Sequence, residues 1–296
     1  MRLVLLICLT MMAFAGNSVL TRAGLVGEGM DAVSFGTIRL VAGALTLLGL
    51  CLLLRGGLRL WGPGRAFSVA ALLLYFYAFS AASDGLDAGL GAIILFGVVQ
   101  ITMFAGGLVK GETMPARRWL GAAVSMAGLV WLLWPDGAVT VSLWHGLSMA
   151  LGGVGWGLYS LAGRASRDAL NATAANFLLT APLGLLLWLG FSQSGVMPPV
   201  WDSTGAWLAV LSGAVTSGMG YALWYSVLPR IEASVAAVAQ LSVPVIAMAG
   251  GMVLLGEVLT LRFVLAGGLV LGGVALSVMA PKRGGGGPLD KRKQGG

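Results

Sequence analysis

The stretch DAGLGAIILFGVVQITMFAGGLVKGE at residues 87–112 decides the fold, because it is long and apolar and has a counterpart later in the chain. Between its charged ends it holds about 20 largely apolar residues, the length that an α-helix needs to cross a hydrocarbon core of about 30 Å. Residues 232–257, EASVAAVAQLSVPVIAMAGGMVLLGE, match it at both ends and at Ile101, Met103 and Gly106. The two stretches are therefore predicted to be equivalent membrane helices.

The whole chain has the composition of a membrane protein. Of its 296 residues, 58% are hydrophobic and 10% are charged, with a mean hydropathy of +0.92, whereas soluble domains carry about 25% charged residues. Apolar windows predict an all-α protein with ten transmembrane helices, at residues 3–21, 32–54, 66–83, 88–109, 117–134, 143–163, 172–191, 204–228, 233–255 and 261–280. The short connections exclude an extramembrane catalytic or nucleotide-binding domain, which needs at least about 50 residues.

The basic residues are sorted by side, so the net charge of +7 is interpreted as a topology signal and not as a nucleic-acid site. With both termini on one side, only Arg22 and Arg262 fall on the other, and Arg39 lies within a span. The positive-inside rule then predicts a bacterial inner-membrane protein with both termini in the cytoplasm. Residues 281–296 are Gly-rich and basic, which predicts a disordered cytoplasmic tail that anchors topology, with an anionic-lipid site as the less favoured alternative. Cys8 and Cys51 lie in apolar runs and are assigned to packing.

The internal repeat extends beyond the two opening stretches. A shift of 145 residues also pairs Arg117 with Arg262 and Gly128 with Gly273. The sequence thus predicts a first five-helix repeat at 1–135 and a second at 143–280. Because five is odd, the second repeat would enter the membrane inverted, as in many secondary transporters. The first span also resembles a secretory signal, but its removal would leave nine helices and destroy this symmetry.

At particular motifs the chain resembles the drug/metabolite transporter superfamily, in its ten-helix branch of two-repeat exporters. The motifs are Gly16-Asn17-Ser18, GYALWY at 220–225, Ile231-Glu232-Ala233-Ser234, Pro244 and Gly256-Glu257. Within that branch the chain looks most like the bacterial aromatic amino acid exporters, by its overall appearance and aromatic content. The resemblance implies transport, although similar members move amino acids, metabolites, sugars or drugs.

No carboxylate lies deep in a predicted span, since all Asp and Glu residues fall in connections or at helix ends. Proton-coupled cation exporters usually need a buried acid. Proton–cation antiport is therefore disfavoured, and we expect a neutral or zwitterionic cargo that moves down its gradient. Arg39 lies about 10 Å from the start of its helix. Its side chain could snorkel to the interface or bond exposed carbonyls, which are structural roles, or it could face the pathway and attract a substrate carboxylate; the structural interpretation is favoured at this depth.

Two prolines interrupt predicted helices. Pro244 frees the carbonyl of Gln240, close to Ser242, which predicts either a plain kink or a polar acceptor in the pathway. Pro182 predicts a kink in the seventh helix. Gln100, near the equivalent position of the fourth helix, could bind substrate or link helices.

Aromatic residues suggest where a flat ligand would lie. Trp156 belongs to a stripe from His145 to Gly163 and has several glycines beside it, which predicts space for stacking. His145 has no carboxylate near it in sequence, so neither catalysis nor metal binding is expected there. The pairs Gly153 with Gly157 and Gly268 with Gly272 predict close helix approach.

The sequence thus predicts an exporter of small amphipathic metabolites, most of all aromatic or neutral amino acids, that works by alternating access. The substrate-binding candidates are Asn17, Tyr77, Gln100, Trp156, Tyr159, Tyr221, Trp224, Gln240, Ser242 and Arg39. The hinge or kink candidates are Pro182, Pro244, Gly106, Gly107, Gly250 and Gly251. We expect no catalytic residue, cofactor or metal, and a monomer whose partners are a small-molecule substrate and the lipid bilayer, without nucleic acid. Alternatives are a multidrug or sugar exporter and an intramembrane lipid-modifying enzyme, although HExxH, a Ser/His/Asp set and a buried acid pair are all lacking.

Overall fold

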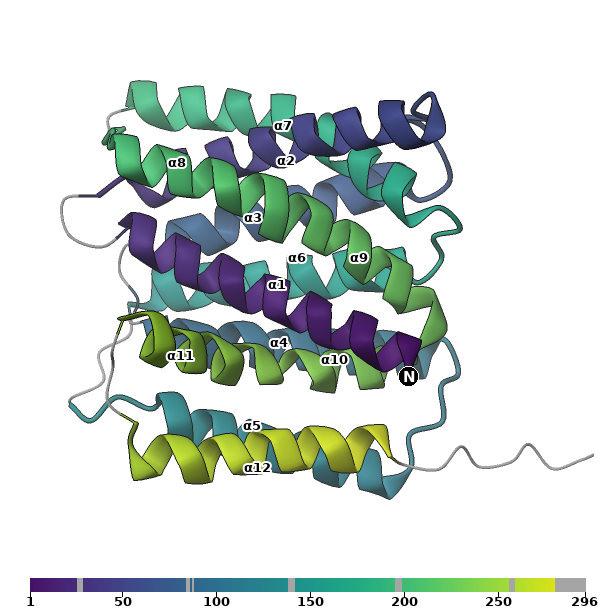
Figure 1. The fold of residues 1–296 in the computed structure, drawn as a ribbon, viewed down its shortest axis with the longest axis vertical. Coiled ribbons are helices and arrows are strands. Elements are labelled where there is room, and N and C mark those ends of the chain that lie inside the picture. The colour runs from purple at the N-terminus through teal and green to yellow at the C-terminus, as the bar shows by residue number, and fades with distance from the viewer. Residues whose placement is uncertain are drawn as a thin grey trace, which may run out of the picture.

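The computed structural model describes residues 1–25, 29–83, 86, 88–137, 142–194, 199–255 and 259–279. Throughout these ranges the regular structure is helical, without a strand (Figure 1). The helices are α1 (Arg2–Leu25), α2 (Ala32–Arg55), α3 (Arg65–Ser83), α4 (Ala88–Val109), α5 (Ala116–Leu133), α6 (Leu143–Gly163), α7 (Ala169–Ser194), α8 (Ser203–Leu211), η1 (Ser212–Met219), α9 (Gly220–Val227), η2 (Leu228–Arg230), α10 (Ala233–Gln240), α11 (Ser242–Leu255) and α12 (Leu261–Val278).

Two of the predicted spans are built from several helical pieces. The α-helices α8 and α9 are joined by the π-helix η1 and followed by the short 3₁₀-helix η2. Similarly, α10 and α11 follow one another with only Leu241 between them. The other eight spans are single helices, so the all-α fold predicted from the sequence is confirmed. Within the described residues, eight helical segments, these two composite spans included, are long and apolar enough to cross a membrane.

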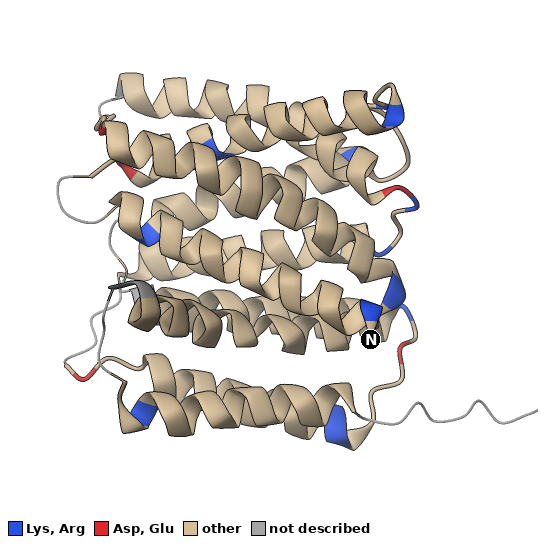
Figure 2. Cartoon of the chain, viewed as in Figure 1, with Lys and Arg blue, Asp and Glu red and all other residues tan. Residues whose placement is uncertain are grey.

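Successive spans run in opposite directions, and the N-terminus lies on the same side of the bundle as the end of α12 (Figure 1). Most of the described basic residues also lie toward that side (Figure 2). Arg22 in the last turn of α1 and Arg262 at the start of α12 lie at the opposite ends of these two helices. This arrangement agrees with the charge pattern from which the sequence predicts a cytoplasmic location for both termini. The membrane side itself stays a prediction.

Each helix of one half has neighbours that correspond to those in the other half. The first-half helix α3 packs on α6, and the second-half pieces η1 and α9 pack on α1. Likewise α4 packs on α6, and α11 packs on α1. Two further pairs, α2 with α7 and α5 with α12, each join a first-half helix to its second-half counterpart. These neighbours are what two five-helix repeats would give, and the boundaries 1–135 and 143–280 stay a prediction.

Glycines allow some of these helices to approach closely. A Cβ atom on Gly153 would lie 2.8 Å from Cβ of Val98, and one on Gly157 would lie 2.7 Å from Cβ of Thr102, so α6 and α4 approach closely there, as predicted. The prediction for Gly268 and Gly272 is wrong, because both are exposed and a Cβ on either would meet nothing within 4 Å. The opposite face of α12 makes the close contact instead: a Cβ on Gly273 would lie 2.6 Å from the carbonyl oxygen of Gly121 in α5.

The exterior of the bundle is apolar, as a lipid-facing surface must be. Leu53 is 84% exposed and Ile101 is 70% exposed. Cys51 is buried in the core, as predicted, whereas Cys8 is exposed on α1 and does not pack inside the protein. Both thiols are free. The apolar run around Cys8 did not show which way its side chain faces, because α1 is apolar on both its buried and its lipid-facing sides.

Candidate functional site

Nine aromatic side chains meet in the core of the bundle and are called the aromatic cluster below. Its members are Phe14, Tyr75, Phe76, Trp156, Tyr159, Phe177, Tyr221, Trp224 and Tyr225. All are at most 8% exposed, and they come from α1, α3, α6, α7 and α9. The ring centroids of Trp156 and Tyr221 are 4.7 Å apart, which is a normal aromatic packing distance. Four sequence candidates, Trp156, Tyr159, Tyr221 and Trp224, are thus brought together.

The indoles of this cluster are hydrogen-bonded to polar groups of neighbouring helices. Trp156 donates its Nε1–H to Oε1 of Gln240, which is fully buried at the end of α10. Nε2 of Gln240 donates to the carbonyl oxygen of Ala236 at 3.2 Å and lies 3.4 Å from the sulfur of Met103. Trp224 donates to Oγ of Ser160 at 3.1 Å. Gln240 and Trp156, two of the substrate-binding candidates, are therefore in contact, and the partner of the Gln240 side chain is an indole.

The glycines beside Trp156 do not leave space for a ligand, so that part of the prediction is wrong. A Cβ on Gly155 would lie 2.7 Å from the backbone nitrogen of Tyr75 in α3, and one on Gly152 would lie 3.3 Å from that of Phe79. The missing side chains are thus replaced by the backbone of a neighbouring helix. Because the rings touch one another, a ligand reaches Trp156 only by separating them.

Asn176 joins the tyrosines of the cluster to a basic residue at the end of the bundle. Its Nδ2 lies 3.4 Å from the hydroxyl of Tyr159 and 3.3 Å from that of Tyr225. Nη1 of Arg65 donates to Oδ1 of Asn176 at 2.6 Å and to the carbonyl oxygen of Ala172 at 2.7 Å. Asn176 was not predicted from the sequence as a site residue, although an amide within an apolar span was a signal for it.

Arg39 does not snorkel, which corrects the favoured interpretation of this residue. Its side chain is inside the bundle and the residue is only 2% exposed. Nη1 donates to Oδ1 of Asn17 at 3.3 Å, and Cζ lies 4.4 Å from the ring centroid of Phe76 in the aromatic cluster. Nε of Arg39 has no hydrogen-bond partner in the described part of the chain. Within the same residues, no carboxylate forms an ion pair with Arg39.

Asn17 is the centre of a polar cluster beside this arginine. Its Oδ1 also accepts hydrogen bonds from the hydroxyls of Ser212 at 2.6 Å, Ser217 at 3.3 Å and Thr216 at 3.4 Å. These three hydroxyls lie on the π-helix η1, and π-helical turns occur frequently at functional sites. These three residues were not predicted as site residues, because hydropathy shows only a weakly polar segment at η1.

Three predicted site residues lie elsewhere. Tyr77 donates its hydroxyl to the carbonyl oxygen of Gly184 at 2.6 Å and lies 3.0 Å from Oγ1 of Thr37, so it links α3 to α7 and α2. Gln100 is half-buried on α4, where Val99 and Met103 are the inward-facing neighbours. Ser242 donates to the carbonyl oxygen of Ala239 at 2.7 Å within its own span.

The candidate hinges differ in their surroundings. Near Pro244 the span is interrupted at Leu241, as the proline predicts, whereas Pro182 lies inside the continuous helix α7. Gly106 packs directly against the side chain of Leu161. A Cβ on Gly107 would lie 2.7 Å from Oε2 of Glu112, and one on Gly250 would lie 4.0 Å from Val19. Gly251 is buried. A hinge role for these glycines stays a prediction.

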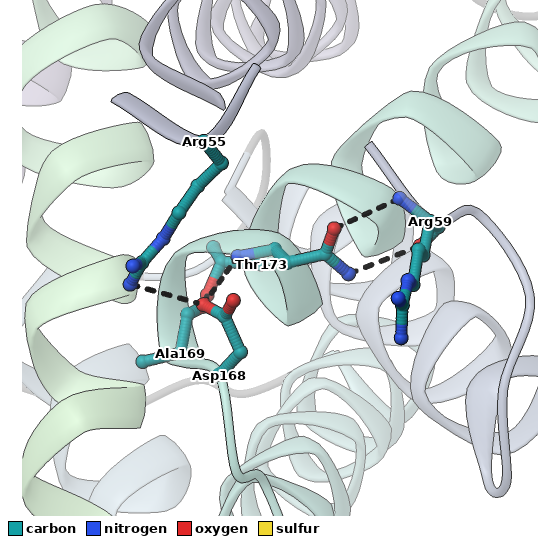
Figure 3. A network of polar contacts seen from close by, with 6 residues as sticks. Arg55, Arg59, Asp168, Ala169 and Thr173 are labelled. Carbon is teal, nitrogen blue, oxygen red and sulfur yellow. Dashed lines mark hydrogen bonds and ion pairs between the residues drawn. The ribbon is translucent and has the colours of Figure 1, made fainter. Parts of the chain in front are cut away.

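The described carboxylates lie at helix ends, as expected. Glu112 pairs with Arg164 and accepts the backbone N–H of Ala233 at 2.9 Å, at the start of α10. Arg118, 4% exposed, pairs with Glu232 and donates to Oγ of Ser234 at 3.0 Å. Arg55 forms an ion pair with Asp168 at 3.7 Å (Figure 3). The backbone of Arg59 is paired with the side chain of Asn171. The predictions that fall on Glu28, Asp84, Asp87, Gly256-Glu257 and the tail 281–296 lie outside the described residues.

A metal site is not evident in the described ranges, where no three His, Cys, Asp or Glu side chains are grouped to hold an ion. His145 is half-buried near the start of α6. The site therefore consists of a buried cation, a group of hydroxyl and amide groups, and the aromatic cluster. Such a set can hold a small molecule by charge, hydrogen bonds and ring contacts.

Relatives of the chain are found in bacteria and archaea. It is 45% identical over 283 residues to an uncharacterized protein of Pseudomonas aeruginosa, with 96% of each chain covered. It is 21% identical over 202 residues to an uncharacterized transporter of Bacillus subtilis, with 67% of this chain and 68% of that one covered. An uncharacterized transporter of Archaeoglobus fulgidus is 44% identical over 69 residues, which are 23% of this chain and 25% of that one.

A solved crystal structure of a protein has the same fold, with a TM-score of 0.80 over 93% of this chain and 96% of the other, at 19% sequence identity. The model of the EamA-like transporter family matches the chain twice, at residues 1–134 and at residues 143–279. The drug/metabolite transporter superfamily suggested by the motifs is therefore confirmed, although the aromatic amino acid exporter branch is not. The chain belongs to the EamA-like transporter family.

Proposed function

We propose that this transporter exports small amphipathic molecules that carry a carboxylate, above all aromatic and neutral amino acids, across the bacterial inner membrane. The observation that supports this substrate class most strongly is Arg39, a buried guanidinium without a carboxylate partner in the described residues, in contact with the aromatic cluster.

An unpaired charge inside a membrane protein is costly, so its presence calls for a partner. Asn17 and the π-face of Phe76 give Arg39 only partial compensation, because neither carries a full negative charge. A carboxylate would form two parallel charge-assisted hydrogen bonds with a guanidinium. Since Nε of Arg39 is unbonded, the arginine keeps a donor available for such a ligand.

The aromatic cluster lies directly beside the guanidinium group of Arg39. Phe76, under Arg39, has its ring centroid 5.6 Å from that of Tyr75 and 6.1 Å from that of Phe177. A carboxylate held at Arg39 would thus have its side chain among rings, once the rings separate to admit it. Each ring contact is worth about 0.5 to 1.5 kcal/mol beyond area burial, which favours aromatic side chains over small aliphatic ones.

The transport mechanism that we propose is gradient-driven alternating access. The family model matches each half separately, and the helix neighbours of the halves correspond, as expected for rocking of inverted repeats. Because the described carboxylates lie at helix ends, none of them is placed to carry a proton through the centre. The direction that we propose, export, rests on the resemblance to exporters.

Counterflow in proteoliposomes tests this proposal, with L-phenylalanine, phenylethylamine and 3-phenylpropionate as a matched series. The amine lacks the carboxylate and the acid lacks the ammonium group. Without an imposed pH difference, we expect counterflow of phenylalanine, weak transport of the amine, and a loss of roughly 10- to 150-fold for phenylalanine in Arg39→Gln, as for a lost charged hydrogen bond. Arg117→Gln, an exposed arginine on α5, is the matched control and should transport normally.

Several results would contradict the proposal. If the wild-type protein moves the amine as well as phenylalanine, Arg39 does not select a carboxylate. Counterflow of dyes or sugars without any amino acid would favour the multidrug or sugar alternative. A strict requirement for a pH gradient would show that transport is proton-coupled.

A further inference from the structure

A concave site lies at the basic end of the bundle, on the outside of the aromatic cluster. It is a groove of about 570 Å³ between the end of α2, the start of α7 and α9, and is called the basic groove below. Arg55, Arg167 and Arg230 line it, and Tyr225 of the aromatic cluster lies behind it. Figure 3 shows Arg55 reaching from the end of α2 across this region toward Asp168.

The charge of the basic groove is positive. Asp168 is its acidic member, and it pairs with Arg55 at 3.7 Å, where both side chains are about half exposed. Arg167 and Arg230 are exposed, and neither forms an ion pair with any described residue. The groove therefore offers two unneutralised guanidinium groups to an anion.

The rest of the basic groove is apolar and continues onto the outer surface. Leu50, Met219 and Leu223 line it, and Met219 is 40% exposed. Val215, one turn deeper on the same span, is 42% exposed. From Arg230 to Met219 the span covers about 16 Å, close to the depth of one leaflet of the hydrocarbon core. A water-filled entrance for substrate would not need such an apolar wall open to lipid.

We propose that the basic groove binds one anionic phospholipid, with the headgroup phosphate between Arg167 and Arg230 and an acyl chain along Leu50, Leu223 and Met219. Basic pockets between transmembrane helices on the cytoplasmic side are suited to anionic headgroups, because the negative lipids of that leaflet supply the counter-charge. The lipid would touch the start of α7 and the outer side of α9, next to Tyr225. This inference is independent of the transported substrate.

Native mass spectrometry of the purified full-length protein, titrated with dioleoylphosphatidylglycerol or dioleoylphosphatidylcholine, tests this proposal. The wild-type protein should retain one phosphatidylglycerol in preference to phosphatidylcholine. In the double variant Arg167→Gln/Arg230→Gln the affinity should fall about 25-fold, at about fivefold for each arginine. The matched control is Arg2→Gln/Arg117→Gln, which removes the same charge from the same end outside the groove and should bind as the wild type does.

One further variant and two soluble competitors distinguish a bound phospholipid from other anionic ligands. Ala222→Phe narrows the groove without changing charge and should also reduce retention of phosphatidylglycerol, because Ala222 lines the apolar wall. If both double variants lose the lipid equally, the attraction is a general surface effect and the site is refuted. If glycerol 3-phosphate or phenylalanine displaces the lipid at equal concentration, the groove binds a soluble anion or forms the pathway entrance, and the proposal is wrong.

Discussion

The third and fourth helices of the two family-matched regions differ in regularity. In the first region α3 and α4 are continuous α-helices, whereas in the second the third span contains the π-helix η1 and the fourth is interrupted at Leu241. Each irregular segment has a buried side, and Ser212 and Gln240 in them are fully inaccessible. Irregular backbone is tolerated in a membrane where it is covered by protein or lines a cavity.

The irregular segments supply polar groups to the site, and the regular half supplies the charge. Hydroxyls of η1 reach Asn17, which accepts from Arg39, and Gln240 at the end of α10 accepts from Trp156. The difference suggests that the two halves have separated roles while keeping similar helix neighbours. Three experiments test this division, from the largest expected effect to the smallest.

The largest effect concerns the inverted relation of the two halves. In a Cys8→Ala/Cys51→Ala background, Thr113→Cys after α4 should react with an impermeant thiol reagent only from the cytoplasm. Leu259→Cys, 64% exposed at the corresponding connection after α11, should react only from outside. Labelling of intact cells against inverted vesicles measures this, and reaction of both cysteines from one side would refute the inverted repeat.

A smaller effect is expected from changing Gly213, the glycine at which the π-helix packs closely against α2. Gly213→Ala would place a methyl group against the backbone carbonyl oxygen of Arg39, which cannot rotate away. Overpacking of this kind costs about 1 to 3 kcal/mol, so the melting temperature and folded yield should fall. Gly268→Ala on α12, where a Cβ meets nothing within 4 Å, is the matched control and should be neutral. Equal stability of the two variants would contradict the tight contact between η1 and α2.

The smallest effect concerns the interruption at Leu241. Trp156→Phe keeps a ring but removes the hydrogen bond to Gln240, which is worth about 0.5 to 1.5 kcal/mol, or roughly two- to tenfold in affinity. We expect phenylalanine counterflow to fall relative to that of alanine. Trp224→Phe, which loses the bond to Ser160 of a continuous helix, should affect both substrates alike. Identical substrate ratios in the two variants would remove any special role of the interruption.

Hydropathy was sufficient to place the spans. The predicted ranges 32–54 and 204–228 correspond to α2 at 32–55 and to the composite helix at 203–230, because lipid requires long apolar segments with internally bonded backbone. The π-helix was not predicted, since nothing in the local composition marks it, and the close contact of its Gly213 with α2 involves residues far away in the chain. Pro244 did indicate the interruption near Gln240, because a missing N–H is a local property.

The site was predicted only in part, because burial depends on neighbours that a single sequence does not reveal. Depth along its own helix suggested that Arg39 could reach the interface, yet Asn17 and Phe76 hold it inside. The glycines next to Trp156 suggested empty space, yet α3 fills it. Asn176 went unnoticed for the same reason, since its importance lies in contacts with residues far away in the chain.

The packing of α5 against α12 has a consequence for biogenesis. These helices share a glycine-lined contact through Gly121 and Gly273, although one is made in the middle of synthesis and the other at its end. At about 5 to 20 residues per second, α5 waits roughly 7 to 30 s for its partner to leave the ribosome. Two arginines lie in its first turn, directly after Ala116. The contact between α5 and α12 therefore forms only once the last helix has left the ribosome, and until then the glycine-lined face of α5 has no α12 to cover it.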